Sequence, residues 1–248
     1  MVHAVHTSSD DPHPSILRSH LSDHLDLAEV TDETIGSRVV TLRAADTGGH
    51  RSAANILVHR MYAPRGYKTS TETPPPALNV VTLIACDEGE TIGTISISLD
   101  TPSGLLADDL FRAELDALRA QGRRLCEFTK LAMDHVVKSK RVLASLFHAA
   151  YIWSHLRLGF HDVVIEVNPR HVRYYERMLG FVVTGPERLN RRVDAPAVLM
   201  RLDFNHARVQ IERFAGKPVP SGERSLYPHF FSSKEEAGIA ARLPVLRT

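Results

Sequence analysis

Val163 to Phe181 (VVIEVNPRHVRYYERMLGF) is the stretch that decides the fold. It begins with a run rich in β-branched residues, as in a strand that is buried on both faces. Asn168 is suited to cap a helix, and proline is favoured at the first helical position after such a cap. Gly180 ends the helix after Leu179. The stretch therefore predicts a strand, a helix and then the start of a further strand.

Patterns on both sides extend this order along the chain. Alternating or β-branched runs predict strands, and apolar residues at helical spacing predict helices. Predicted strands lie at 38–44, 78–85, 91–99, 124–133, 181–184 and 197–202. Predicted helices lie at 53–62, 106–120 and 140–157, and Ser139 is suited to cap the last of them. The order predicts an α/β fold, with a central sheet of mixed direction flanked by helices.

The chain divides into three parts. Residues 1–35 are polar and rich in histidine at their start, and we expect a flexible arm there. Residues 36–204 carry the predicted strands and helices and form the main domain. Residues 205–248 contain Tyr227, Phe230 and Phe231, which are too apolar for a free tail, so this extension is expected to pack on the domain.

Composition excludes several classes of protein. The formal net charge of +1 over 248 residues argues against a nucleic-acid binder. No apolar run is long enough to span a bilayer or to form a signal-peptide core. Cys86 and Cys126 lie in apolar stretches and are expected to be reduced core thiols, which fits a cytoplasmic location. The histidines show no ligand-type spacing, so no metal is expected.

Two motifs carry a resemblance to a known family. The first is Asn168 to Phe181, where two tyrosines precede a Gly-Phe pair, and the second is Cys126 to Asp134 (CEFTKLAMD). Together they resemble the N-acyl amino acid synthases of the FeeM type. These belong to the GNAT-like acyltransferase superfamily and are related to the LuxI-type acyl-homoserine lactone synthases. Lys130 departs from the pattern, because the family more often has arginine there, and lysine cannot bind a carboxylate in the bidentate manner of arginine.

The resemblance implies transfer of a long-chain fatty acyl group from a carrier thioester to the α-amine of an amino acid. Glu127 is the candidate general base, because apolar neighbours raise the pKa of a carboxyl group. Tyr175 is the candidate proton donor to the leaving thiol, with Tyr174 as its alternative. The resemblance also places Lys130, Leu131, Ala132 and Met133 in substrate binding, with a backbone N–H near Leu131 to Met133 stabilising the oxyanion.

The loop before the predicted helix at 140–157 bears on the acyl donor. Residues 135–141 (HVVKSKR) contain no glycine, whereas CoA-dependent relatives usually have a glycine-rich turn there for the pyrophosphate. Lys138, Ser139, Lys140 and Arg141 instead form a basic helix start that suits the acidic surface and single phosphodiester of an acyl carrier protein. Acyl-phosphopantetheine on that carrier is therefore favoured over acyl-CoA as donor, and no permanently bound cofactor is expected.

Phe128, Leu146 and Trp153 are the candidate lining of an apolar acyl channel. The lipid product is expected to bring the protein into peripheral contact with a membrane. Two other functions remain open at this stage. One is a CoA-dependent N-acetyltransferase, against which the glycine-free loop argues. The other is a catalytically silent GNAT-like module that binds a lipid or a partner protein, against which Glu127 argues.

Overall fold

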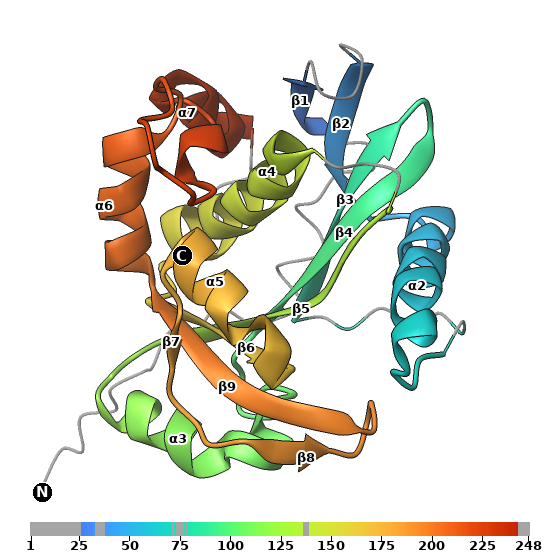
Figure 1. Ribbon diagram of the computed structural model, residues 1–248, viewed down its shortest axis with the longest axis vertical. Helices are drawn as coiled ribbons and strands as arrows, with labels where there is room; N and C mark the ends of the chain where they lie inside the picture. Colours follow the sequence, from blue (N-terminus) through green and yellow to red (C-terminus); the bar gives the residue numbers. More distant parts are fainter. Residues whose placement is uncertain are drawn as a thin grey trace, which may run out of the picture.

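The computed structural model describes residues 26–32, 38–70, 72, 77, 79–135 and 139–242. Their strands form one twisted sheet in the order β1-β2-β3-β4-β5-β6-β9-β7, with β8 paired to β9 (Figure 1). Among these strands, only β5 and β6 pair in parallel. The strands are β1 Asp26–Asp32, β2 Arg38–Ala44, β3 Val80–Asp87, β4 Glu90–Leu99, β5 Leu125–Met133, β6 Asp162–Val167, β7 Val182–Val183, β8 Arg188–Asn190 and β9 Ala195–Asp203.

Helices cover both faces of the sheet. The helices α2 (Gly48–Tyr62) and α3 (Asp108–Ala120) lie on one face (Figure 1). The opposite face carries α4 (Lys140–Tyr151), which continues as a π-helical turn at Ile152–Arg157. Also on that side are α5 (Val172–Leu179), α6 (Phe204–Phe214) and α7 (Ser233–Arg242). The predicted α/β class, with a mixed sheet between helices, is confirmed.

Local signals explain where several helices begin. The Ser139 side chain accepts a hydrogen bond from the Val142 N–H at 3.0 Å, and Asn168 accepts one from the Arg170 N–H at 3.2 Å. Both are the caps that the sequence predicts. α2 begins at Gly48, before the predicted start, because Thr47 caps it by accepting from the His50 N–H at 3.1 Å. None of the described helices combines the length and apolar content needed to cross a bilayer.

The first described strand corrects one expectation. Residues 26–32 belong to the stretch predicted as a flexible arm, but they form β1 and pair antiparallel with β2. A register shift between Asp26 and Ala28 buries both Leu27 and Ala28, so the strand lacks the strict alternation that identifies a strand in sequence. The rest of the predicted arm lies outside the described residues.

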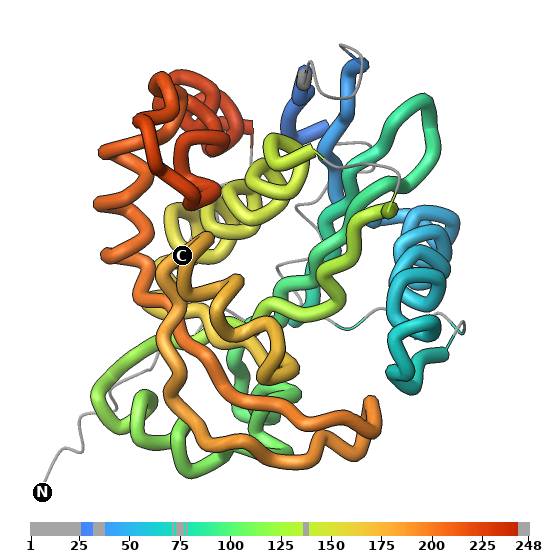
Figure 2. Tube along the Cα trace, viewed as in Figure 1, coloured from blue at the N-terminus to red at the C-terminus, as the bar shows by residue number. Residues whose placement is uncertain are grey.

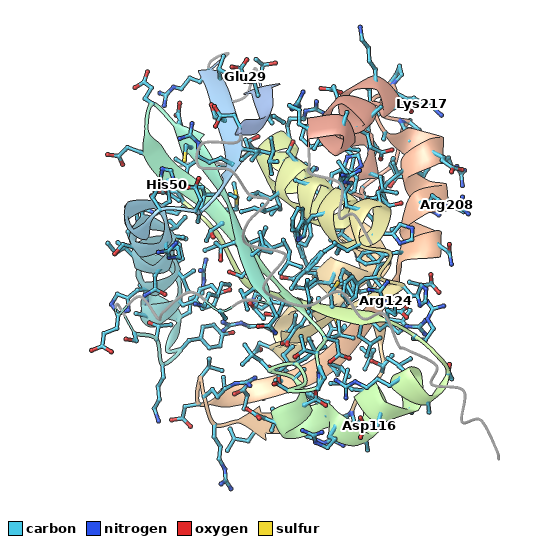
Figure 3. All side chains as sticks on the ribbon, turned by 180° about the vertical axis from the view of Figure 1, so that it is seen from behind. Glu29, His50, Asp116, Arg124, Arg208 and Lys217 are labelled. Atoms are coloured by element: carbon cyan, nitrogen blue, oxygen red, sulfur yellow. The ribbon has the colours of Figure 1, made fainter. Side chains whose placement is uncertain are left out.

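The segment after β9 packs against α4 (Figure 2). Arg141 on α4 donates to the carbonyl oxygens of His229 at 2.9 Å and Phe230 at 2.8 Å. His148, which is fully buried, accepts from the Phe231 N–H through Nδ1 and contacts the Glu236 carboxylate through Nε2 at 2.7 Å. The outer side of α6 and the following turn carry Arg208 and Lys217 (Figure 3).

The strands β5 and β6 pair over a short stretch only, and a buried carboxylate lies where that pairing begins. The two strands pair only from Leu125 opposite Asp162 to Glu127 opposite Val164. Asp162 is fully buried at the start of β6 and accepts hydrogen bonds from Arg123, which precedes β5, and from Arg201 on β9. One carboxylate thus joins three neighbouring strands where β5 and β6 meet, and beyond Glu127 the two strands separate.

We expect Asp162→Asn to lower the free energy of unfolding by about 3 kcal/mol, because it leaves two arginines without their buried counter-charge. Asp203→Asn is the matched control, since Asp203 contacts the same arginines but its side chain is 35% exposed. The decrease in the free energy of unfolding of Asp203→Asn should stay below about 1 kcal/mol. Urea unfolding monitored by circular dichroism measures both, and equal losses in the two variants would contradict the role given to Asp162.

Candidate active site

A cavity of about 980 Å³ lies where β5 and β6 separate. Its walls come from the second half of β5, the end of β6, α5, α2 with the loop after it, and the β8–β9 hairpin. The apolar residues that line it are Val58, Met61, Leu106, Phe128, Leu131, Ala132, Met133, Leu143, Val167, Val193, Pro196 and Ala197. Polar side chains also line it, among them three carboxylates. Glu127 and Glu166 are largely buried, and Glu72 is exposed.

Glu127 is the first of these carboxylates. It is fully buried on β5, its Oε2 accepts a hydrogen bond from the Ala107 N–H at 3.2 Å, and its Oε1 has no hydrogen-bond partner among the described residues. Burial raises the pKa of Glu127 to about 8, and the nearby charge of Glu166 adds to the rise. A carboxyl group in this state accepts a proton readily near neutral pH.

Glu166 is the second carboxylate, and the sequence analysis missed it. It lies on β6 two residues after Val164, the residue that pairs with Glu127. Its Oε2 contacts the guanidinium of Arg192 and lies 3.4 Å from Nδ2 of Asn190, while its Oε1 is buried without a partner among the described residues. Burial raises its pKa to about 7. Glu166 is the one charged residue within the β-branched run at 163–167, and this exception to the apolar pattern is the sequence feature that indicates it.

Tyr175 lines the same cavity from α5. Burial raises the pKa of its phenol well above the usual range. The hydroxyl therefore stays protonated and can donate. Tyr174 also lines the cavity but is 38% exposed. Tyr62, from α2, is committed elsewhere, since its hydroxyl donates to the Leu131 carbonyl at 2.7 Å.

A β-bulge disturbs β5 beside the cavity. Thr94 on β4 pairs with Ala132, but Ser96 pairs with Thr129, so β5 carries one extra residue between these pairs. Lys130 takes up the irregularity with a φ of 51°, an uncommon value for a residue other than glycine. Lys130 and the three residues after it all line the cavity. The structure thus brings the stretch predicted to bind substrate together with Glu127 and Tyr175.

The predicted acyl-channel residues divide between cavity and core. Phe128 lines the cavity. Leu146 and Trp153 do not; they are buried in the main hydrophobic core with α4. The sequence pattern misplaced them because it showed one apolar face on this helix without showing which part of that face meets the sheet. Leu143, one turn before Leu146, is the α4 residue that reaches the cavity.

The predicted carrier-binding residues are not brought together at the cavity. Ser139 is buried as the cap of α4, Lys140 is exposed, and Lys138 lies outside the described residues. Arg141 points to the C-terminal segment, where it also contacts Glu235 at 3.0 Å. Its charge is therefore used within the fold rather than presented by the loop.

The described residues contain no group of three or more His, Cys, Asp or Glu side chains that could hold a metal ion. Both cysteines are buried, free thiols, as the sequence predicts. The arrangement that remains is a largely apolar cavity with two buried carboxylates, a protonated phenol and an irregular strand. This set can remove a proton from a nucleophile and hold a long apolar substrate.

Comparison with known proteins agrees with this chemistry. Residues 53–203 match the family described as N-acyl amino acid synthase FeeM. The solved structure of FeeM, an N-acyl amino acid synthase from uncultured soil microbes, is 30% identical with a TM-score of 0.61. The match covers 68% of this chain and 93% of that one. No similar sequence was found among the curated proteins.

More distant solved structures also match. An acyl-CoA N-acyltransferase from Pseudomonas aeruginosa is 14% identical with a TM-score of 0.47, covering 65% of this chain and 97% of that one. The acyl-homoserine lactone synthase LasI is 15% identical with a TM-score of 0.48, covering 68% and 91%. The family match spans more than half of the chain and includes both motifs identified in the sequence. The chain belongs to the FeeM family of N-acyl amino acid synthases, has the GNAT-like fold, and is an acyltransferase.

Proposed function

We propose that this acyltransferase moves a long-chain fatty acyl group from acyl carrier protein to the α-amine of an amino acid. The observation that carries the proposal is the buried, unpartnered Oε1 of Glu127 in an apolar cavity of about 980 Å³. That volume is near the upper end of the range of about 300–1,000 Å³ for small-molecule sites. It leaves room for an amino acid together with a long acyl chain.

In the proposed reaction, Glu127 removes one proton from the acceptor ammonium. The freed amine then attacks the thioester carbonyl carbon, and the carbonyl oxygen becomes an oxyanion. Backbone N–H groups at the bulge, near Leu131 to Met133, are the proposed donors to that oxyanion. Collapse of the intermediate forms the amide and breaks the C–S bond. Tyr175 donates a proton to the departing thiolate, which leaves as the thiol. The Tyr175 phenolate then accepts the second proton of the acylated nitrogen, which leaves the neutral amide.

The acceptor also needs a counter-charge for its carboxylate. Lys130 lines the cavity, and no carboxylate among the described residues acts on the pKa of its ammonium, which burial lowers. We propose that its ammonium binds the carboxylate of the amino acid. It acts as a single point charge, in contrast to the fork that an arginine would present.

The choice of carrier protein over CoA rests on the loop before α4 and on charge. The loop at 135–141 has no glycine to form a pyrophosphate cradle. Lys140 is exposed at the helix start, and Arg170, Arg173 and Arg177 are exposed along the 3-10 turn and helix that border the cavity. This basic surface suits the acidic helices of an acyl carrier protein.

The test is to incubate the protein with palmitoyl acyl carrier protein and the twenty amino acids, and to search for acylated products by mass spectrometry. An N-palmitoyl amino acid establishes the reaction and names the acceptor. Acetylation from acetyl-CoA without palmitoyl transfer would replace the proposal by a CoA-dependent acetyltransferase. Silence with both donors would favour a module that only binds.

Glu127→Gln is expected to lower kcat by about 10²–10⁴-fold, because the amide cannot accept the proton of the ammonium. Binding of the acyl carrier protein, measured by surface plasmon resonance, should not change. Glu212→Gln, at an exposed position on α6, is the control and should retain full activity. Wild-type turnover in the Glu127 variant would rule out its role as base.

The pH dependence of kcat/KM should reveal the pKa of Glu127. Activity requires the ionised base, so kcat/KM should fall as the pH drops below about 8. Because the charge of Glu166 helps to raise this pKa, Glu166→Gln should move the acid limb to lower pH. The ionisation of the substrate amine is the same in both enzymes, so the difference between their profiles reports the enzyme group. Superimposable profiles would contradict the assignment.

A further inference from the structure

Two largely buried carboxylates, Glu127 and Glu166, lie in the cavity although proton removal needs only one. The parallel register sets Val164 beside Glu127, and Glu166 follows two residues later on the same face of β6. A strand rises about 3.3 Å per residue, so Glu166 lies about 7 Å further along the direction that opens into the cavity. The two side chains are close enough for the charge of Glu166 to act on Glu127.

Each carboxylate keeps one oxygen without a partner. The side chain of Glu127 is fully buried, that of Glu166 is only 10% exposed, and the Oε1 atoms of both lack hydrogen bonds among the described residues. Leaving buried acceptors unsatisfied costs free energy, unless a ligand supplies the donors. Both residues line the same cavity, so one ligand can reach both.

The second carboxylate oxygen of Glu166, Oε2, is held by contacts within the fold. Arg192 contacts its Oε2 and also donates to the Leu106 carbonyl at 2.6 Å and to Asp109 at 2.8 Å. Asn190 approaches the same oxygen. These contacts fix the carboxylate through Oε2 and leave Oε1 as the atom that a ligand can use.

We propose that Glu166 is a second binding residue for the acceptor, and that the acceptor's ammonium binds between Oε1 of Glu127 and Oε1 of Glu166. The inference rests on the proposed function. An ammonium has three N–H donors, and the two carboxylate oxygens accept two of them. When Glu127 takes its proton, Glu166 retains its hydrogen bond to the nitrogen and holds the lone pair toward the thioester. The site then selects a cationic primary amine over a neutral hydroxyl group of the same size.

A purely structural role for Glu166 would consist of holding Arg192 and the β8–β9 hairpin. Asp109→Asn separates the two roles, because Asp109 is the exposed second partner of the same guanidinium and is absent from the cavity lining. Both substitutions remove a charged partner of Arg192. Only Glu166→Gln also removes the proposed partner of the acceptor's ammonium.

The experiment uses palmitoyl acyl carrier protein as donor and the equimolar pool of twenty amino acids as acceptor. We expect Glu166→Gln to raise the half-saturating concentration of the pool at least tenfold while that of the donor stays unchanged. Asp109→Asn should stay within twofold of wild type for both. Unchanged acceptor saturation in Glu166→Gln, or an equal change in Asp109→Asn, would overturn the inference while leaving the proposed function intact.

Binding without the donor tests the inference independently of the reaction. The amino acids, added one at a time, should raise the Tm of the wild-type protein for at least one acceptor, and this shift should disappear in Glu166→Gln but not in Asp109→Asn. If that pattern holds while no donor yields a product, the inference stands and the proposed reaction fails. If no amino acid shifts the Tm of the wild-type protein, or if Glu166→Gln shows the same shift, the inference fails.

Discussion

The early separation of β5 from β6 is the constraint on which the rest of the site depends. Neighbouring strands in a sheet ordinarily pair along their length, because an unpaired buried backbone group is costly. Here the pairing covers three residues on each strand, and Asp162 anchors its start through Arg123 and Arg201. The carboxylate fixes the place where the strands meet, and the separation beyond it creates the cavity. A site made in this way uses rigid strands rather than loops to position its groups.

The separation also explains the electrostatics of the site. Glu127 is the last residue of β5 that is paired with β6, so it lies at the closed end of the opening, where water is excluded. The hydrogen bond to its Oε2 comes from the backbone N–H of Ala107, and no cation is paired with it in the described structure. This environment favours the neutral form and raises the pKa, which suits the role of base proposed for Glu127. Glu166 differs because Arg192 offsets part of the same burial penalty.

The sequence predicts the elements with strong local signals and misses those that tertiary contacts decide. The caps at Ser139 and Asn168, the strands β3 and β4 and the strand carrying Glu127 follow from patterns of a few residues. The sequence does not indicate β1, because its register shift breaks the alternation, and it predicts no helix at α6 or α7. In the site, Glu127 and Tyr175 share a cavity, as their motifs suggest. Glu166 and Arg192 belong to no motif that was recognised, and only the pairing of β6 and β8–β9 brings them to the same place.

The C-terminal segment shows why a charged residue in sequence need not face a partner. Arg141 stands in a basic run, and the run alone favours a solvent-exposed docking surface. In the structure, its guanidinium binds two backbone carbonyl groups and the Glu235 carboxylate. Two turns further along α4, His148 binds the same segment. These contacts hold Tyr227, Phe230 and Phe231 over the core. Under the proposed function, the positive charge left for an acidic carrier lies instead with Lys140 and with Arg170, Arg173 and Arg177, which are exposed.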